Sequence, residues 1–156
     1  MKQLVKTICY EALSTSELTP VEQALVNSAK NATKGSYSPY SHFAVGAAVL
    51  LDDGTVVLGA NQENGAYPSG LCAERTALFS AGANYPNRKV VAIAIAAFTN
   101  GAFLDEPITP CGACAQVMAE TETRAGKPLN ILLYGEKCTY RLTGVNSILP
   151  FAFSLK

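Results

Sequence analysis

The sequence carries little charge, and the charge it has is balanced. Charged residues make up 15% of the 156 positions, and 12 lysines and arginines are matched by 12 aspartates and glutamates. Nucleic-acid binders depend on cationic side chains that neutralise phosphates, so this balance argues against a nucleic-acid partner. Hydrophobic residues make up 49% of the chain, which is enough for a full core and excludes wholesale disorder. We expect some of this apolar surface to be buried between subunits.

Long hydrophobic runs are also absent. The longest wholly apolar stretch, Val90–Phe98, has nine residues, whereas a helix needs about 20 to span a membrane. The N-terminal region has lysines but no long apolar segment, so we expect no signal or transit peptide and no membrane partner. The expected location is the cytoplasm, where thiols stay reduced. Five cysteines, an odd number, then favour metal binding or catalysis over disulfides.

The hydrophobic pattern predicts one α/β domain over residues 1–156. The expected helices are Pro20–Ala32, Cys72–Ala83 and Cys111–Glu122. The expected strands are Ala44–Leu51, Thr55–Gly59, Val90–Phe98, Asn130–Tyr134 and Thr139–Leu142, and Val145–Leu149 is a possible helical turn. A short leading helix over Leu4–Leu13 stays an open alternative. A hairpin followed by strand–helix–strand units implies a mixed sheet covered by helices on both faces.

Three cysteines occur where a loop enters a predicted helix. Cys72 begins one such helix, and Cys111 and Cys114 begin the next in the motif Pro-Cys-Gly-Ala-Cys. A helix N-terminus carries partial positive charge, which stabilises a thiolate. Two intervening residues place the sulfurs of Cys111 and Cys114 on one side of the first turn, where a metal could bridge them. With Cys72 as a third ligand, Zn²⁺ would keep one position open for water, as catalytic zinc sites do.

Glu74 indicates that this cluster is catalytic. A bound Zn²⁺ lowers the pKa of water to near 7, and a carboxylate two residues from a ligand can carry the proton that is released. Zinc-dependent base deaminases use the pattern His-x-Glu…Pro-Cys-x-x-Cys, and this chain has Cys72 where they have His. Three thiolates leave the site with excess negative charge. Arg75 could offset that charge by donating hydrogen bonds to a ligand sulfur.

The sequence allows two other interpretations of the cysteines. A closed, purely structural zinc site would need a fourth ligand, for which Cys9, His42 and Cys138 are the candidates. A redox disulfide between Cys111 and Cys114 would fit the Cys-x-x-Cys spacing. Neither reading gives a role to Glu74.

The chain resembles the small, three-cysteine cytidine deaminases. The motifs that carry the resemblance are Tyr40-Ser41-His42-Phe43, Val45-Gly46-Ala47-Ala48, Asn61-Gln62-Glu63-Asn64, Cys72-Ala73-Glu74-Arg75-Thr76-Ala77 and Pro110-Cys111-Gly112-Ala113-Cys114. The resemblance implies a three-layer α/β/α fold with a mixed five-stranded sheet. It also implies one zinc per subunit and a homotetramer whose active sites are shared across subunits.

The resemblance further implies a role for each matching residue. Cys72, Cys111 and Cys114 would hold zinc and Glu74 would shuttle protons. The N–H of Ala73 would contact the pyrimidine carbonyl, Phe43 would pack beside base and sugar, and Asn61 and Glu63 would bind ribose hydroxyls. Tyr67 and Phe153 would reach the sites of neighbouring subunits. Asn61 could offer a hydroxyl pair both a donor and an acceptor.

The implied activity is hydrolysis of cytidine and 2′-deoxycytidine to uridine and 2′-deoxyuridine with release of ammonia, in pyrimidine salvage. One alternative is deamination of a cytosine-containing nucleoside antibiotic such as blasticidin S. A second is a non-catalytic, zinc-stabilised oligomeric module. A third is a polynucleotide deaminase, against which the zero net charge counts.

Overall fold

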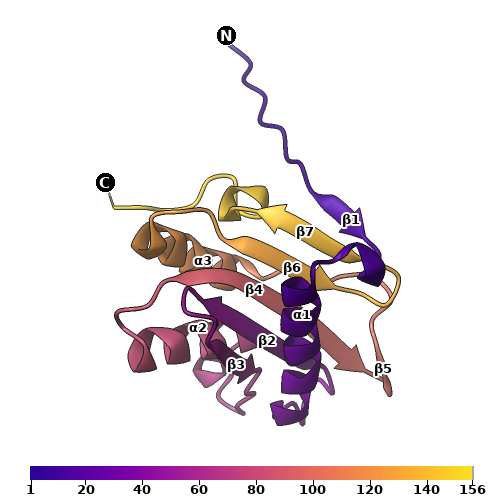
Figure 1. Ribbon diagram of the computed structural model, residues 1–156. Coiled ribbons are helices and arrows are strands. Elements are labelled where there is room, and N and C mark those ends of the chain that lie inside the picture. The colour runs from indigo at the N-terminus through magenta and orange to yellow at the C-terminus, as the bar shows by residue number, and fades with distance from the viewer. Residues whose placement is uncertain (156) are drawn as a thin grey trace.

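The computed structural model describes residues 1–155 and contains one mixed sheet (Figure 1). Its strands run in the order β1-β7-β6-β4-β2-β3, and β5 pairs with β4. The strands are β1 (Glu11–Leu13), β2 (Ala44–Leu51), β3 (Val56–Ala60), β4 (Val90–Thr99), β5 (Ala102–Phe103), β6 (Asn130–Tyr134) and β7 (Thr139–Thr143). The α-helices are α1 (Pro20–Ala32), α2 (Ala73–Asn84) and α3 (Gly112–Ala125). Among these seven strands of residues 1–155, only β4 and β6 pair in parallel, because α3 connects them as a crossover.

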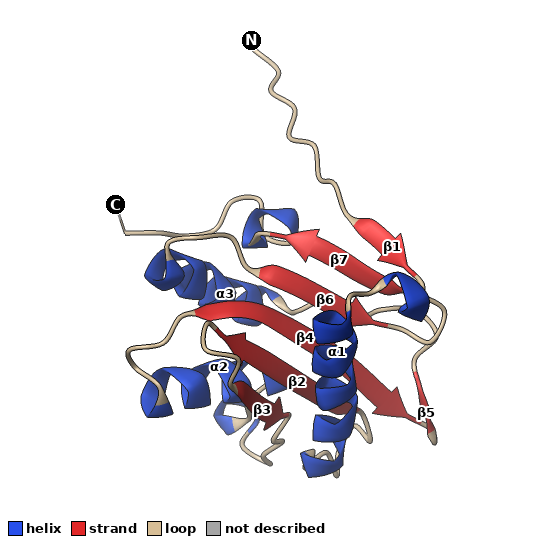
Figure 2. Ribbon diagram, viewed as in Figure 1, coloured by secondary structure: helices blue, strands red, loops and turns tan. Residues whose placement is uncertain are grey.

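Helices cover both faces of the sheet, as the alternation of elements predicted (Figure 2). Helix α1 covers one face, while α2 and α3 cover the other. Successive residues of β2 point to opposite faces, so Ala48 packs in the cluster under α1, while Ala47 and Val49 pack with α2 and α3. The three-layer α/β/α prediction is therefore confirmed. No helix among residues 1–155 combines the length and hydrophobicity needed to cross a membrane.

Two glycines allow helices to approach the sheet closely. A Cβ at Gly46 of β2 would collide with the backbone at the end of α1, and a Cβ at Gly59 of β3 would collide with the backbone of α2 at Ala77. Any larger residue at Gly59 would push α2 away from the sheet. This contact matters for function because α2 begins at the cysteine cluster.

The prediction of five strands was wrong, since the sheet has seven. The five expected strands are present, and β1 and β5 are additional. They have three and two residues, which is too short to give a periodic hydrophobic signal. Strand β1 lies within Leu4–Leu13, a segment for which the sequence also allows a short helix, and it is held by pairing with β7.

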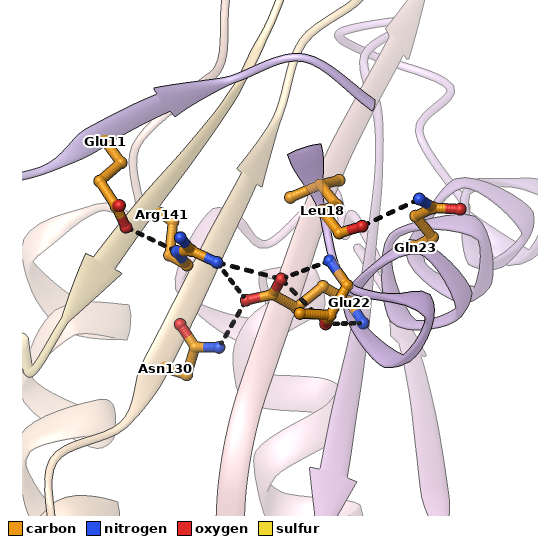
Figure 3. Close-up of polar contacts among 7 residues, drawn as sticks. Glu11, Leu18, Glu22, Gln23, Asn130 and Arg141 are labelled. Carbon is orange, nitrogen blue, oxygen red and sulfur yellow. Dashed lines mark hydrogen bonds and ion pairs between the residues drawn. The ribbon is translucent and has the colours of Figure 1, made fainter. Parts of the chain in front are cut away.

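A partly buried ion pair joins Glu22, in the first turn of α1, to Arg141 on β7, the strand next to the edge strand β1 (Figure 3). Glu22 is 8% exposed and accepts hydrogen bonds from Arg141 Nη1 at 3.1 and 3.2 Å and from Asn130 Nδ2 at 3.3 Å. Glu22 also closes a capping box with Thr19. The Nε of Arg141 reaches Glu11 on β1 at 2.6 Å. Burial alone would raise the pKa of Glu22, but these hydrogen bonds outweigh it and hold the pKa below 4.5.

We expect Arg141→Met to lower the free energy of unfolding at pH 7 by about 1–3 kcal/mol, because Glu22 would stay buried without its cation. The pKa of Glu22 is lower in the folded than in the unfolded chain, so the pair stabilises above about pH 5 and this stabilisation is lost as pH falls. Denaturant unfolding should therefore show a smaller difference in unfolding free energy between wild type and Arg141→Met at pH 4 than at pH 7. The control is Lys137→Met, which removes only exposed ion pairs to Asp105 and Glu106. An equal loss of unfolding free energy at both pH values would contradict this account.

Candidate metal centre and active site

Two helix N-termini bring three cysteine sulfurs together. Cys72 is the N-cap of α2 and Cys111 is the N-cap of α3, while Cys114 lies one turn into α3 and is fully buried. The Sγ atoms of Cys72 and Cys111 are 4.0 Å apart, and those of Cys111 and Cys114 are 3.5 Å apart. The partial positive charge at both helix ends favours thiolates at this point.

The sulfur positions fit a zinc ion. Tetrahedral ligands at the usual Zn–S bond length of 2.3 Å are about 3.8 Å apart, which is close to both sulfur separations. The three sulfurs form a group within 4.8 Å of one another, and no other His, Cys, Asp or Glu of residues 1–155 joins it. Cys9, His42 and Cys138, the candidates for a fourth ligand, are therefore not part of the cluster. All five cysteines are free, so the Cys111–Cys114 disulfide is not formed.

Glu74 lies beside this cluster and is 5% exposed. Burial raises the pKa of its carboxyl above the ordinary value, although hydrogen bonds from its own backbone N–H and from Cys114 oppose the shift. Burial and the nearby Glu74 carboxylate likewise raise the pKa of the Cys114 thiol. A raised carboxyl pKa suits a group that must both accept and return a proton near neutral pH.

Arg75 places a cation against one of the sulfurs. Its Nη2 donates to Cys72 Sγ at 3.5 Å. The Cys72 sulfur, and secondarily Cys114, raises the pKa of the guanidinium. The Nε of Arg75 is buried and has no acceptor among the residues that the structure describes. The guanidinium can thus neutralise part of the negative charge that three thiolates would carry.

A cavity of about 610 Å³ opens against the cysteine cluster. This volume suits a small organic ligand such as a nucleoside. Sixteen residues line it: Tyr40, Ser41, Val45, Asn61, Gln62, Glu63, Asn64, Tyr67, Gly70, Leu71, Cys72, Ala73, Glu74, Arg75, Ile108 and Cys111. The wall therefore combines the first turn of α2 with two polar loops. Ala73 lies at the first position of α2, where backbone N–H groups lack helical partners.

Asn61 has fewer free hydrogen-bonding groups than the sequence led us to expect. Its Oδ1 accepts from Ser36 Oγ at 2.6 Å and from the backbone N–H of Val45 at 2.8 Å, and its Nδ2 donates to the carbonyl of Phe43 at 2.9 Å. Both lone pairs of Oδ1 are thus engaged, and one N–H is left for a ligand. The expectation that Asn61 offers both a donor and an acceptor is therefore corrected to a single donor.

Glu63 is fixed by the loop opposite it. The backbone N–H groups of Tyr40 and Ser41 donate to its Oε2 at 2.9 and 3.3 Å. Hydrogen bonding from Ser41, with a smaller contribution from the Tyr40 backbone, holds the pKa of Glu63 below its ordinary value. Both backbone bonds end on Oε2, so they leave Oε1 available. The Glu63 side chain is therefore held in place and ionised, and its Oε1 can accept a hydrogen bond from a ligand in the cavity.

The structure places the three predicted aromatic residues differently. Tyr67 lines the cavity and is 80% exposed, with its ring 6.4 Å from that of Tyr40 in an edge-to-face pair. Phe43 and Phe153 are not among the residues that line the cavity of a single chain. Phe153 is 69% exposed on the C-terminal segment.

Sequence reasoning did not assign a role to Tyr40 or to Ile108. Tyr40 belongs to a motif that carries the resemblance, so that motif is the signal that could have identified it as a wall residue. Ile108 lies between β5 and α3 in a segment without hydrophobic periodicity, and no sequence signal identifies it.

The segment that contains this site matches a known protein family. Residues 19–126 match the family model described as the cytidine and deoxycytidylate deaminase zinc-binding region. The match includes α2, α3 and all three cysteines of the cluster.

Individual proteins similar to this chain are also cytidine deaminases. The chain is 53% identical over 98 residues to a cytidine deaminase of Halalkalibacterium halodurans, covering 63% of this chain and 70% of that protein. It is 42% identical over 132 residues to a cytidine deaminase of Sporosarcina psychrophila, covering 85% and 90%. The crystal structure of a cytidine deaminase from Burkholderia pseudomallei superposes with a TM-score of 0.72 and 43% identity, over 87% of this chain and all of that one.

Proposed function

The chain belongs to the cytidine and deoxycytidylate deaminase family, and we propose that its cysteine cluster and Glu74 together form the active site. The protein is a zinc-dependent enzyme that hydrolyses cytidine to uridine and ammonia. One observation carries the assignment of residues: a buried carboxylate lies beside three sulfurs at the wall of a cavity of nucleoside size. We propose that 2′-deoxycytidine is also a substrate and that the enzyme serves pyrimidine salvage.

In the proposed mechanism Cys72, Cys111 and Cys114 would hold the zinc. When bound, zinc supplies Lewis acidity that lowers the pKa of a water to near neutrality. Glu74 takes a proton from the attacking water and delivers it to N3 of the base as the water oxygen bonds to C4. Glu74 then takes the remaining proton from the hydroxyl added at C4 and delivers it to the amine, so the C4–N4 bond breaks, the C4 carbonyl forms and ammonia leaves. The net reaction adds one water to cytidine and yields uridine and ammonia.

Other residues position the nucleoside. The N–H of Ala73 contacts the pyrimidine carbonyl, and the remaining N–H of Asn61 and the carboxylate of Glu63 bind ribose hydroxyls. We propose that Phe43, although it does not line the cavity of the single chain, packs beside the base and sugar. Arg75 lowers the excess negative charge on the sulfurs and so preserves the acidity of the attacking water.

We propose that the enzyme assembles as a homotetramer with shared sites and is located in the cytoplasm. Tyr67 and Phe153 are 80% and 69% exposed in the single chain, which leaves both rings available to neighbouring subunits.

Competition kinetics test the proposed substrate class. Zinc-loaded enzyme would be given cytidine, 2′-deoxycytidine, blasticidin S and a cytosine-containing single-stranded oligonucleotide. We expect the two nucleosides to have the highest kcat/KM, because Asn61 and Glu63 match ribose hydroxyls. A higher kcat/KM for the antibiotic or the oligonucleotide would contradict the proposal.

Glu63→Gln should lower kcat/KM for cytidine by about 10- to 100-fold, the usual value of a hydrogen bond to a charged group, mainly through KM. The control substrate is 2′,3′-dideoxycytidine, which lacks the 2′ and 3′ hydroxyls of the ribose. Since Glu63 also braces Tyr40 and Ser41, this control separates hydroxyl binding from loop support. A loss of similar size with both substrates would contradict the ribose-binding role.

A further inference from the structure

The C-terminal segment of the chain is exposed yet held in place. After β7 and a single helical turn over Val145–Ser147, the chain runs over the surface without forming another helix or strand up to residue 155. Phe151 and Phe153 are 91% and 69% exposed, so neither ring is fixed by burial in the core. An exposed apolar segment of this kind would be mobile unless polar contacts fixed its backbone.

Gln116 supplies such contacts with both ends of its side-chain amide. Its Nε2 donates to the carbonyl of Phe153 at 2.8 Å, and the backbone N–H of Phe153 donates to its Oε1 at 3.1 Å. Two antiparallel hydrogen bonds fix the orientation of a peptide as well as its position. Gln116 follows Cys114 by two residues on α3. These two hydrogen bonds, the Gln116–Phe153 clamp, therefore tie Phe153 to the helix that carries two of the sulfurs.

Lys6 provides a second contact from the other end of the chain. Its Nζ donates to the carbonyl of Pro150 at 2.6 Å and lies 5.5 Å from the centroid of the Phe151 ring. Lys6 and Phe153 both lie outside the 19–126 region that matches the family model, whereas Gln116 lies inside it. The first ten residues are otherwise exposed, so this is a specific contact from a segment with little packing of its own.

The clamp does not serve the cavity of its own chain. None of the cavity-lining residues comes from the segment after Cys111, so Phe153 adds nothing to that wall. We propose that Gln116 is a positioning residue: by clamping the backbone of Phe153, it directs this ring to cover the nucleoside in a neighbouring subunit. Lys6 supports the same segment. The inference rests on the proposed function, in which Phe153 covers a neighbour's base.

Gln116→Ala tests this directly. We expect KM for cytidine to rise about 10-fold, the usual effect of losing one or two hydrogen bonds, with kcat and zinc content nearly unchanged. Gln116→Glu, which keeps an acceptor for the Phe153 N–H but cannot donate to its carbonyl, should lie between wild type and Gln116→Ala. Lys6→Met should have a smaller effect in the same direction. Glu120→Gln, an exposed change one turn further along α3, is the matched control and should leave KM unaltered.

A double-variant cycle separates positioning from a general structural role. If Gln116 acts through Phe153, Gln116→Ala should add little to the loss already caused by Phe153→Ala. Losses that multiply in the double variant, or an unchanged KM in Gln116→Ala, would overturn the inference.

Limited digestion with chymotrypsin, followed by mass spectrometry, tests the clamp without relying on turnover. Cleavage after Phe151 and Phe153 should be faster in Gln116→Ala than in wild type. Equal cleavage would overturn the clamp. If the wild-type enzyme failed to deaminate cytidine, the proposed function would fail, and the digestion would still decide whether Gln116 holds the segment.

Discussion

Glu74→Gln is expected to fold and to bind one zinc per subunit, yet to lose about 10³-fold in kcat for cytidine. Glutamine has nearly the shape of glutamate and can occupy the same buried position beside the cysteine cluster. It cannot accept a proton from water or return one to the base and the leaving amine. The loss should therefore fall on kcat, with KM much less affected, because the substitution removes an interaction made in the transition state.

The comparison needs zinc content and folding measured on the same preparations. Metal analysis and circular dichroism of Glu74→Gln should match wild type, and Glu120→Gln on the surface of α3 should match it in activity as well. Turnover by Glu74→Gln within a few-fold of wild type would remove the proton-transfer role. Loss of zinc from this variant would show that the carboxylate supports the metal instead.

Cys72→Ala is expected to lose both zinc and activity. Removing one of three sulfurs leaves two protein ligands from α3, too few for a stable site of this type. It also removes the sulfur to which Arg75 donates at 3.5 Å. We expect less than about a tenth of a zinc per subunit after dialysis against a chelator, with activity falling in proportion, since metal affinity depends on the full ligand set.

Cys138→Ala is the matched control. Cys138 is a free cysteine outside the three-sulfur group, so its removal should leave zinc content and turnover at wild-type values. Atomic emission measurements on the two variants, paired with cytidine turnover, separate a metal ligand from a cysteine that only packs. Full zinc retention by Cys72→Ala would contradict the three-cysteine centre.

Much of this architecture could be predicted because local signals and long-range contacts agree. Thr19, Pro20 and Glu22 mark the start of α1, and the structure begins the helix there with the capping box formed. Cysteine occupies the N-cap of both α2 and α3, so the positions that fix the helix starts also bring the sulfurs together. The Cys-x-x-Cys spacing holds because one turn of helix separates its two sulfurs.

Other features could not be predicted because they depend on contacts between distant segments. Strand β1 is three residues long and exists through its pairing with β7, which lies more than 120 residues away in the sequence. The hydrogen bonds that use up the acceptor capacity of Asn61 come from Ser36 and Val45, and no spacing rule links these residues. The clamp between Gln116 and Phe153 joins positions 37 residues apart. Such pairings are set by the folded arrangement and not by local pattern.

The central claim is that this protein uses a zinc centre to hydrolyse cytidine. The most direct measurement follows the ultraviolet absorbance of cytidine during incubation with protein that holds one zinc per subunit, together with the ammonia released. We expect uridine and ammonia to form in equal amounts, and formation to stop when zinc is removed by a chelator. Protein with its full complement of zinc that produced neither uridine nor ammonia would contradict the account.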